Sequence, residues 1–157
     1  MIGNSKDIIN WLLNQDKEKQ FEIKEHKQKR SLNANAYCWT LIGKIAEKIG
    51  NTKEDVYREY IRNKGIYQVI TVNKKAAPTF IKIWQDKGLG WICEESENNI
   101  EGLIDIVAYY GSSSYNTKQM AAFIDYVVEE AKAQDIETLP PSEIARLKDT
   151  WDVSKRS

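Results

Sequence analysis

Apolar residues recur at helical spacing through most of the chain, and the residues that bound each run are typical of helix ends. The clearest run is residues 117–134, where Met120, Phe123, Ile124 and Val127 follow one another at helical intervals. This spacing places the apolar side chains on one face of a helix. The same pattern predicts further helices over residues 6–14, 31–50, 52–65 and 76–87, and a shorter last helix over residues 140–151.

Four short segments have the pattern of strands instead. In residues 20–27, Phe21 and Ile23 alternate with charged residues, which favours a half-buried strand. The other predicted strands are residues 66–72, 88–95 and 102–111, and a polar turn at 96–99 joins the last two. The sequence therefore predicts an α+β fold, in which a small, mostly antiparallel sheet is packed with about five helices.

Two helix starts are marked by side chains that can accept a hydrogen bond from a free backbone N–H group. The helix over residues 31–50 has Ser31 or Asn33 as its N-cap. Thr52, followed by Asp55 three residues later, starts the next helix and resembles a capping box with Asp in place of Glu.

Length and composition predict a single domain over residues 1–151, followed by a frayed tail at residues 152–157. No apolar run approaches the roughly 20 residues that span a bilayer. No secretory signal is visible before the first helix, so we expect no membrane contact and a cytoplasmic location. Cys38 and Cys93 are the only cysteines, and we expect both thiols to stay reduced there.

Charge is unevenly distributed, although the net charge of the chain is zero. Residues 1–75 hold 15 Lys and Arg against 9 Asp and Glu, whereas residues 76–157 hold 8 against 14. This asymmetry predicts either an anion-binding face in the first half or only the scatter that is common in highly charged chains.

The sequence lacks the residues that several kinds of catalytic site require. His26 is the only histidine, no closely spaced Cys or His pair exists, and no glycine loop has a phosphate-binding pattern, so we expect no metal and no cofactor. A metal-dependent nuclease is the alternative, because Asp105 lies within an apolar strand and Glu94 or Glu95 on the neighbouring strand could complete a site. Asp105 could equally point to solvent on the polar side of a half-buried strand.

Aromatic residues next to cations indicate a different chemistry. The chain has five Trp and eight Tyr, and several stand in polar company. Cations can neutralise phosphates while neighbouring rings stack on bases without regard to sequence. The predicted DNA-contact residues form two regions, one with Lys27, Lys29, Arg30, Asn35 and Trp39, and one with Ser112, Ser113, Tyr115 and Lys118.

The segment 30–39 reads RSLNANAYCW, and it resembles the R-S-L-x-x-N-x-x-x-W signature of the NinB (Orf) family of phage recombination proteins. The residues that match are Arg30, Ser31, Leu32, Asn35 and Trp39. Further segments, GLGWICE and the run from YYGSSSYN to the last helix, are similar to relatives encoded in phages and prophages of Gram-positive bacteria. The likeness spans most of the chain.

The resemblance implies an α+β homodimer that binds single-stranded DNA or single/double-strand junctions without sequence preference. Such a protein would act in a bacterial host cell and assist the loading of a phage recombinase or annealase onto strands coated by host single-strand-binding protein. It would be a mediator without a catalytic centre. A third hypothesis is a protein-interaction module without DNA binding, in which the acidic C-terminal helices carry the function.

Overall fold

The computed structural model describes residues 1–24 and 33–151. Contacts between residues divide the chain into two compact units, residues 1–31 and 32–157, where the sequence predicted one domain over residues 1–151. Among the described residues, no helix is long and apolar enough to cross a membrane.

The first unit contains helix α1 (Ser5–Leu13), as the sequence predicted. Asn4 caps it, and Asp7 completes a capping box in which each side chain bonds the backbone N–H of the other residue. The strand predicted at residues 20–27 is absent over residues 20–24, which have no regular structure, and its remaining residues lie outside the described part. Phe21 packs edge-on against Trp11 at a ring-centre distance of 5.2 Å instead. An isolated extended segment has no ladder partner, so packing on the apolar helix face takes precedence.

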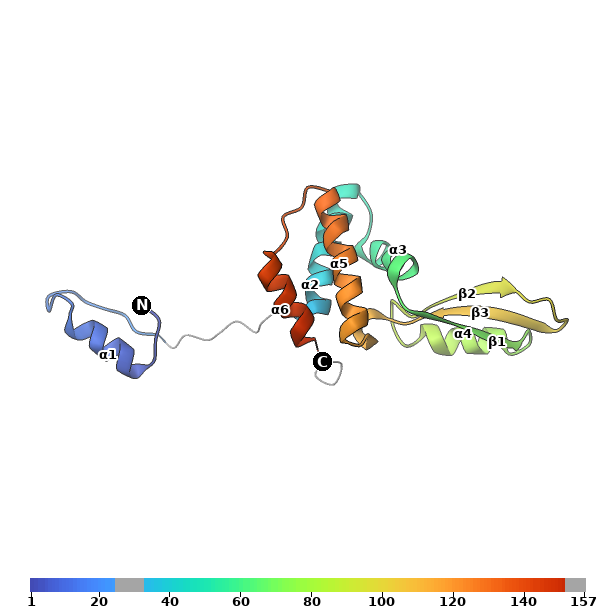
Figure 1. The fold of residues 1–157 in the computed structure, drawn as a ribbon, viewed down its shortest axis with the longest axis horizontal. Helices are drawn as coiled ribbons and strands as arrows, with labels where there is room; N and C mark the ends of the chain where they lie inside the picture. The colour runs from blue at the N-terminus through green and yellow to red at the C-terminus, as the bar shows by residue number, and fades with distance from the viewer. Residues whose placement is uncertain (25–32, 152–157) are drawn as a thin grey trace. The chain divides into compact units, whose positions relative to one another are not determined.

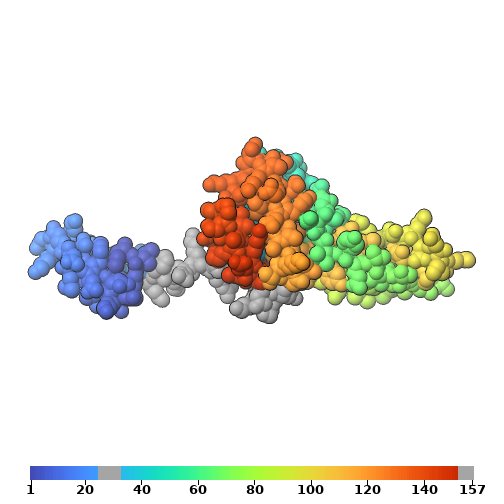
Figure 2. All heavy atoms as spheres, in the orientation of Figure 1, coloured from blue at the N-terminus to red at the C-terminus, as the bar shows by residue number. Residues whose placement is uncertain are grey.

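Five helices form most of the second unit, and with α1 the described residues contain six helices, one at each position where the sequence predicted a helix. Three of them are capped by the side chains of Asn33, Thr52 and Asn116, so Asn33 rather than Ser31 caps the first. In Figure 2 the atoms of the last two helices lie side by side on the face in view. The five helices are α2 (Ala34–Ile49), α3 (Lys53–Lys64), α4 (Ala77–Gln85), α5 (Thr117–Ala133) and α6 (Pro141–Thr150).

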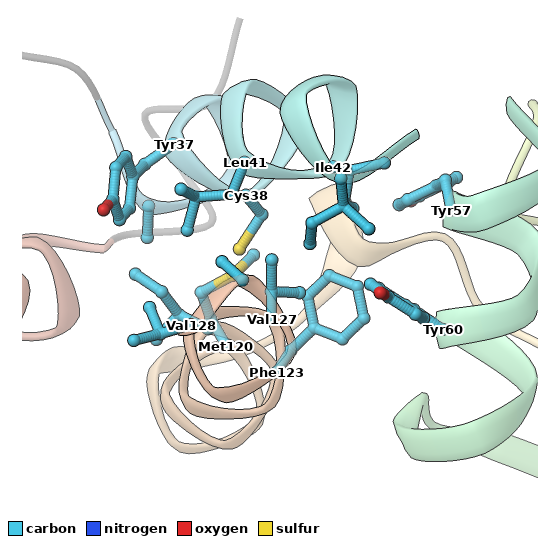
Figure 3. Packing of buried hydrophobic residues seen from close by; sticks show 14 of the residues in the cluster. Tyr37, Cys38, Leu41, Ile42, Tyr57, Tyr60, Met120, Phe123, Val127 and Val128 are labelled. Carbon is cyan, nitrogen blue, oxygen red and sulfur yellow. The ribbon is translucent and has the colours of Figure 1, made fainter. Parts of the chain in front are cut away.

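The hydrophobic core of this unit lies between α2, α3, α5 and α6, and it uses the apolar faces that the periodicity predicted. Figure 3 shows Cys38, Leu41 and Ile42 of α2 facing Phe123 and Val127 of α5. Phe123 is fully buried. Tight packing of these two faces orients the long helices, and the other elements are built on them.

A three-stranded antiparallel sheet, in the order β1–β3–β2, completes the second unit. Its strands are β1 (Tyr67–Asn73), β2 (Ile92–Glu97) and β3 (Leu103–Tyr109). β3 is central because it pairs with β2 through a hairpin and with β1 on its other edge. The α+β fold class is therefore confirmed, with three strands in the described residues instead of the four predicted.

The two faces of the sheet differ in burial. One face carries Ile106 and Ala108, both fully buried, and α4 contacts β2 and β3 on this side of the unit (Figure 1). The other face carries the pair Val69 and Val107, and Val69 is 54% exposed. Since side chains alternate along a strand, α4 covers the face that carries Ile106.

We expect the substitution Phe123→Ala to lower the free energy of unfolding by about 3–5 kcal/mol, because it leaves a cavity between tightly packed helices. Ile83→Ala is the matched control, since Ile83 on α4 is 61% exposed and its truncation should change stability by less than about 0.5 kcal/mol. Urea denaturation followed by circular dichroism measures both. Equal losses in the two variants would contradict the assigned core.

Candidate functional site

The junction between the helical core and the sheet is formed by the loop from β3 to α5. This loop contains a single 3₁₀ turn, Ser112–Ser114, and the side chain of Ser112 is fully buried. Ser112 Oγ donates a hydrogen bond of 2.6 Å to Oδ1 of Asn35 in the first turn of α2. Two regions that the sequence predicted separately, around residue 35 and around residue 112, are thus in direct contact.

Tyr57 of α3 completes the polar contacts at this junction. Its hydroxyl oxygen accepts a 3.0 Å hydrogen bond from the backbone N–H of Ser112 and lies 2.7 Å from Ser112 Oγ. Because the Ser112 hydroxyl proton goes to Asn35, the Tyr57 O–H donates to Ser112 Oγ. Burial raises the pKa of Tyr57, so the neutral donor form persists.

Trp39 packs on this junction and does not stand free of it. Its ring centre lies 4.2 Å from that of Tyr57, with the planes tilted by 31°. Trp39 is half-buried, so one part of the ring still reaches solvent. The loop before β2 approaches Tyr57 closely, since a Cβ on Gly90 would lie 2.7 Å from the tyrosine hydroxyl. Only glycine fits there without displacing the ring.

The burial of Tyr115 and Ser112 contradicts the prediction that residues 112–118 form an exposed contact region. Tyr115 is 1% exposed, and its hydroxyl accepts from the N–H of Ile66 and donates to the carbonyl of Tyr110. Trp151 donates from Nε1 to the carbonyl of Tyr115 at 2.7 Å. Both Ser112 and Tyr115 are therefore buried residues that hold the junction together, where the sequence predicted direct DNA contacts.

The other predicted contact residues divide into two groups. Ser113 and Lys118 are exposed, beside the start of α5. Lys27, Lys29 and Arg30 lie outside the described residues, so their predicted role stays a prediction.

The sequence analysis did not predict a cluster of aromatic side chains that lies next to the junction. Trp84, Trp91 and Tyr110 meet edge-to-face, with ring-centre distances of 5.0–5.5 Å. All three are half-buried. Lys87 places its Nζ 5.3 Å from the Trp91 ring centre and 5.7 Å from that of Trp84. The sequence signal for this cluster is the position of Trp91, which follows Lys87 and two glycines and is not part of the apolar face of a helix.

Trp91 lines two separate hollows on the second unit. The first, of about 440 Å³, is walled by aromatic rings and polar side chains: Tyr67, Gln68, Trp91, Tyr110, Ser114 and Gln119 are among its lining residues. The second, of about 280 Å³, is lined by two arginines, Arg58 and Arg62, among other residues. A Cβ on Gly111 would lie 2.6 Å from Trp91 Nε1, so this glycine allows the indole to pack on the junction loop.

The two arginines differ in their pairing. Arg62 forms an ion pair of 2.8 Å with Glu94. Within residues 1–24 and 33–151, Arg58 has no ion-pair partner. Arg58 is half-buried beside the second hollow, so its charge faces that hollow without a compensating carboxylate.

The carboxylates of the nuclease alternative are only partly brought together. Asp105 pairs with Ser96 and Glu95 with Ile106, so Asp105 and Glu95 are on opposite faces of the sheet. Glu94 shares the face of Asp105 but is bound to Arg62. Asp105 Oδ1 accepts hydrogen bonds from Thr71 (2.6 Å) and from the Asn98 side chain (2.8 Å), which hold the pKa of this carboxyl below its ordinary value.

Asp105 thus lies on the open, polar side of its strand and is already satisfied by two neutral donors. The prediction that Glu95 completes a metal site with Asp105 is wrong. Side chains on one face of a strand are two residues apart, and Glu95 is the immediate neighbour of Ser96, which pairs with Asp105. In the part of the chain that the structure describes, no group of three His, Cys, Asp or Glu side chains is placed to hold a metal ion.

Comparison with known proteins gives no relative. No protein-family model, no curated protein and no solved structure matches this chain.

We expect Tyr57→Phe to lower the free energy of unfolding by about 1–3 kcal/mol, because the buried N–H of Ser112 loses its acceptor. Tyr67→Phe is the matched control, since Tyr67 is 59% exposed and its loss should stay within about 0.5 kcal/mol. Urea denaturation of both variants provides the measurement. A Tyr57→Phe protein as stable as the wild type would show that the junction does not need this hydroxyl.

We also expect stability to fall as pH rises above about 8.5, where an unfolded thiol begins to ionise. Burial raises the pKa of Cys38, so the folded state keeps its proton while the unfolded state loses it. The loss approaches about 1.4 kcal/mol per pH unit for this single group. Burial raises the pKa of Cys93 as well, which adds in the same direction.

The free energy of unfolding measured between pH 7.5 and 10 should show this slope, and Cys38→Ala should make it shallower. An unchanged slope in the variant would contradict the assignment of the slope to Cys38.

Proposed function

We propose that this protein binds single-stranded nucleic acid, with single-stranded DNA as its substrate. The observation that carries the proposal is the position of Trp91, which lines both an aromatic hollow and a hollow with two arginines. Rings for stacking next to cations for phosphates are the combination that single-strand binding requires. Affinity of this kind depends on stacking and charge, so the main contacts are independent of base sequence.

The aromatic hollow supplies the stacking part. The exposed sides of Trp91, Tyr110 and Tyr67 can take unpaired bases, and each base stacked on an aromatic ring contributes about 1–3 kcal/mol. The edge-to-face contacts among the rings restrict their rotation, so little conformational entropy is lost when a base binds.

Charge in the neighbouring hollow supplies the phosphate contacts. Arg58 is the foremost candidate, because its guanidinium lacks a carboxylate partner among the described residues, whereas Arg62 is paired with Glu94. Lys87, over the face of Trp91, adds a further cation at the same place. A strand that stacks one base on Trp91 would run its backbone past these groups.

The likeness of residues 30–39 to the NinB signature supports a more specific role. In this proposal the protein is a recombination mediator that acts as a homodimer on single-stranded or branched DNA and assists loading of a recombinase. Lys27, Lys29 and Arg30 would add phosphate contacts. Asn35 would act by fixing the Ser112 junction, and Trp39 by supporting Tyr57, while its solvent-facing part remains available to a base.

The test is fluorescence anisotropy with a labelled single strand of about 30 nucleotides and its matched duplex, at several salt concentrations. We expect tighter binding to the single strand than to the duplex, and an affinity that falls with salt. Trp91→Ala should weaken binding about 5- to 150-fold, which corresponds to one lost stack, and Trp91→Phe should restore part of it. Arg58→Ala should weaken binding and reduce the slope of log K against log salt by about 0.7.

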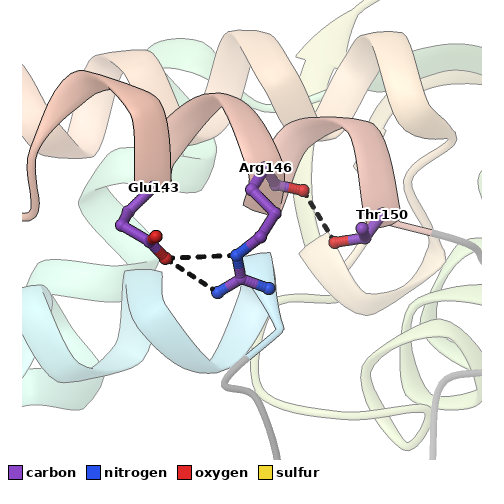
Figure 4. A network of polar contacts seen from close by, with 3 residues as sticks. All are labelled: Glu143, Arg146 and Thr150. Carbon is purple, nitrogen blue, oxygen red and sulfur yellow. Dashed lines mark hydrogen bonds and ion pairs between the residues drawn. The ribbon is translucent and has the colours of Figure 1, made fainter.

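Arg146→Ala is the matched control for Arg58→Ala. Arg146 lies on α6, where its guanidinium is bound to Glu143 (Figure 4), away from both hollows. Its removal should leave affinity and salt slope unchanged. No binding to the single strand at low salt would refute the proposal and favour a protein-interaction module. Cleavage of the strand in the presence of Mg²⁺, lost in Asp105→Asn, would favour the nuclease alternative.

A further inference from the structure

We propose that the aromatic hollow beside Trp91 is a pyrimidine pocket, which selects thymine and cytosine over adenine within a single strand. This inference rests on the proposed function and adds a base preference to it. It comes from the polar groups that line the hollow between the rings, namely the carboxamides of Gln68 and Gln119 and the hydroxyl of Ser114.

The orientation of the Gln119 carboxamide is fixed by the start of α5. The backbone N–H of Asn116 donates a 3.0 Å hydrogen bond to Gln119 Oε1, and the N–H of Gln119 donates in return to Asn116 Oδ1. Because a backbone N–H can only donate, the oxygen of the carboxamide must face the cap. Its NH₂ group is then a donor, and within residues 1–24 and 33–151 no acceptor is bound to it.

Gln68 is arranged in a similar way. Its Oε1 accepts a 2.9 Å hydrogen bond from the hydroxyl of Tyr110, so its NH₂ group is also left as a donor. Ser114 differs, because its hydroxyl proton is donated to the carbonyl of Gly111 at 2.7 Å. The Ser114 oxygen therefore retains lone pairs and can only accept from a ligand. The hollow thus offers two amide donors and one hydroxyl acceptor.

This set of groups complements one class of base. The pairing edges of thymine and cytosine each carry two acceptors and one donor. Adenine presents only one acceptor beside its amino donor, on its pairing edge (N1) and on its major-groove edge (N7) alike. Adenine would therefore leave one amide donor of the pocket without a partner, which disfavours its binding. Stacking between Trp91 and the tyrosines would hold either kind of base, so the amides decide the preference.

Gln119→Glu is the variant that separates this role from the structural one. A glutamate keeps the oxygen that accepts from the Asn116 N–H and is the usual partner in a capping box, so α5 retains its start. It replaces the NH₂ donor with a second acceptor. Gln68→Glu also keeps the structural contact and removes the NH₂ donor, since a carboxylate still accepts from the Tyr110 hydroxyl.

The experiment compares the affinity of the full chain for dT, dC and dA oligomers of equal length and for an oligomer of abasic sites. We expect the wild-type protein to bind dT and dC about three- to tenfold more tightly than dA. In Gln119→Glu the ratio should fall to about one, and Gln68→Glu should lower it as well. Gln85→Glu is the matched control: Gln85 lines the arginine hollow, so the added charge weakens all oligomers and the ratio stays as in the wild type.

Each outcome has a distinct meaning. Wild-type protein that binds no single strand, abasic or not, would overturn the proposed function and this inference with it. Single-strand binding without a pyrimidine preference would overturn only the pocket. A preference that persists in both Gln119→Glu and Gln68→Glu would also overturn it, because the preference would then come from the flexibility of pyrimidine strands and not from the amides.

Discussion

The backbone N–H of Ser112 needs a hydrogen-bond acceptor where the chain passes from the sheet into the helical core. The arrangement of the second unit depends on that hydrogen bond. The group is buried, and a buried N–H without an acceptor costs about 1–3 kcal/mol. The Tyr57 hydroxyl provides the acceptor, and Ser112 passes the contact on to Asn35. One short chain of hydrogen bonds therefore joins α2, α3 and the loop that follows β3.

The aromatic surface is a consequence of this junction. Trp39 packs on Tyr57, and Trp91 packs on the loop that contains Ser112, so rings from segments far apart in the sequence meet at one place. Gly90 and Gly111 permit it, since a side chain at either position would displace an aromatic ring. The residues that fix the junction and the residues that form the hollows are thus neighbours, and a loosened junction would also move Trp91.

Local positive charge lies next to the hollows. The chain has no net charge, so attraction to a polyanion must come from local groups. Arg58 and Lys87 provide such groups beside Trp91, within the second unit. The predicted phosphate contacts of Lys27, Lys29 and Arg30 lie outside the described residues and stay a prediction.

The sequence by itself determined the helices, the Thr52 cap and the fold class, because helical periodicity and capping are local properties of a few neighbouring residues. It failed at residues 20–24, where a strand pattern had no partner, and it predicted Tyr115 as a DNA-contact residue although the ring is buried. Burial of a tyrosine or a tryptophan depends on which distant segments pack against it, as the 77-residue separation of Asn35 and Ser112 illustrates. Only the tertiary structure decided which aromatic rings hold the junction together and which are left to line a hollow, since that is settled by contacts between α2, α3 and two loops.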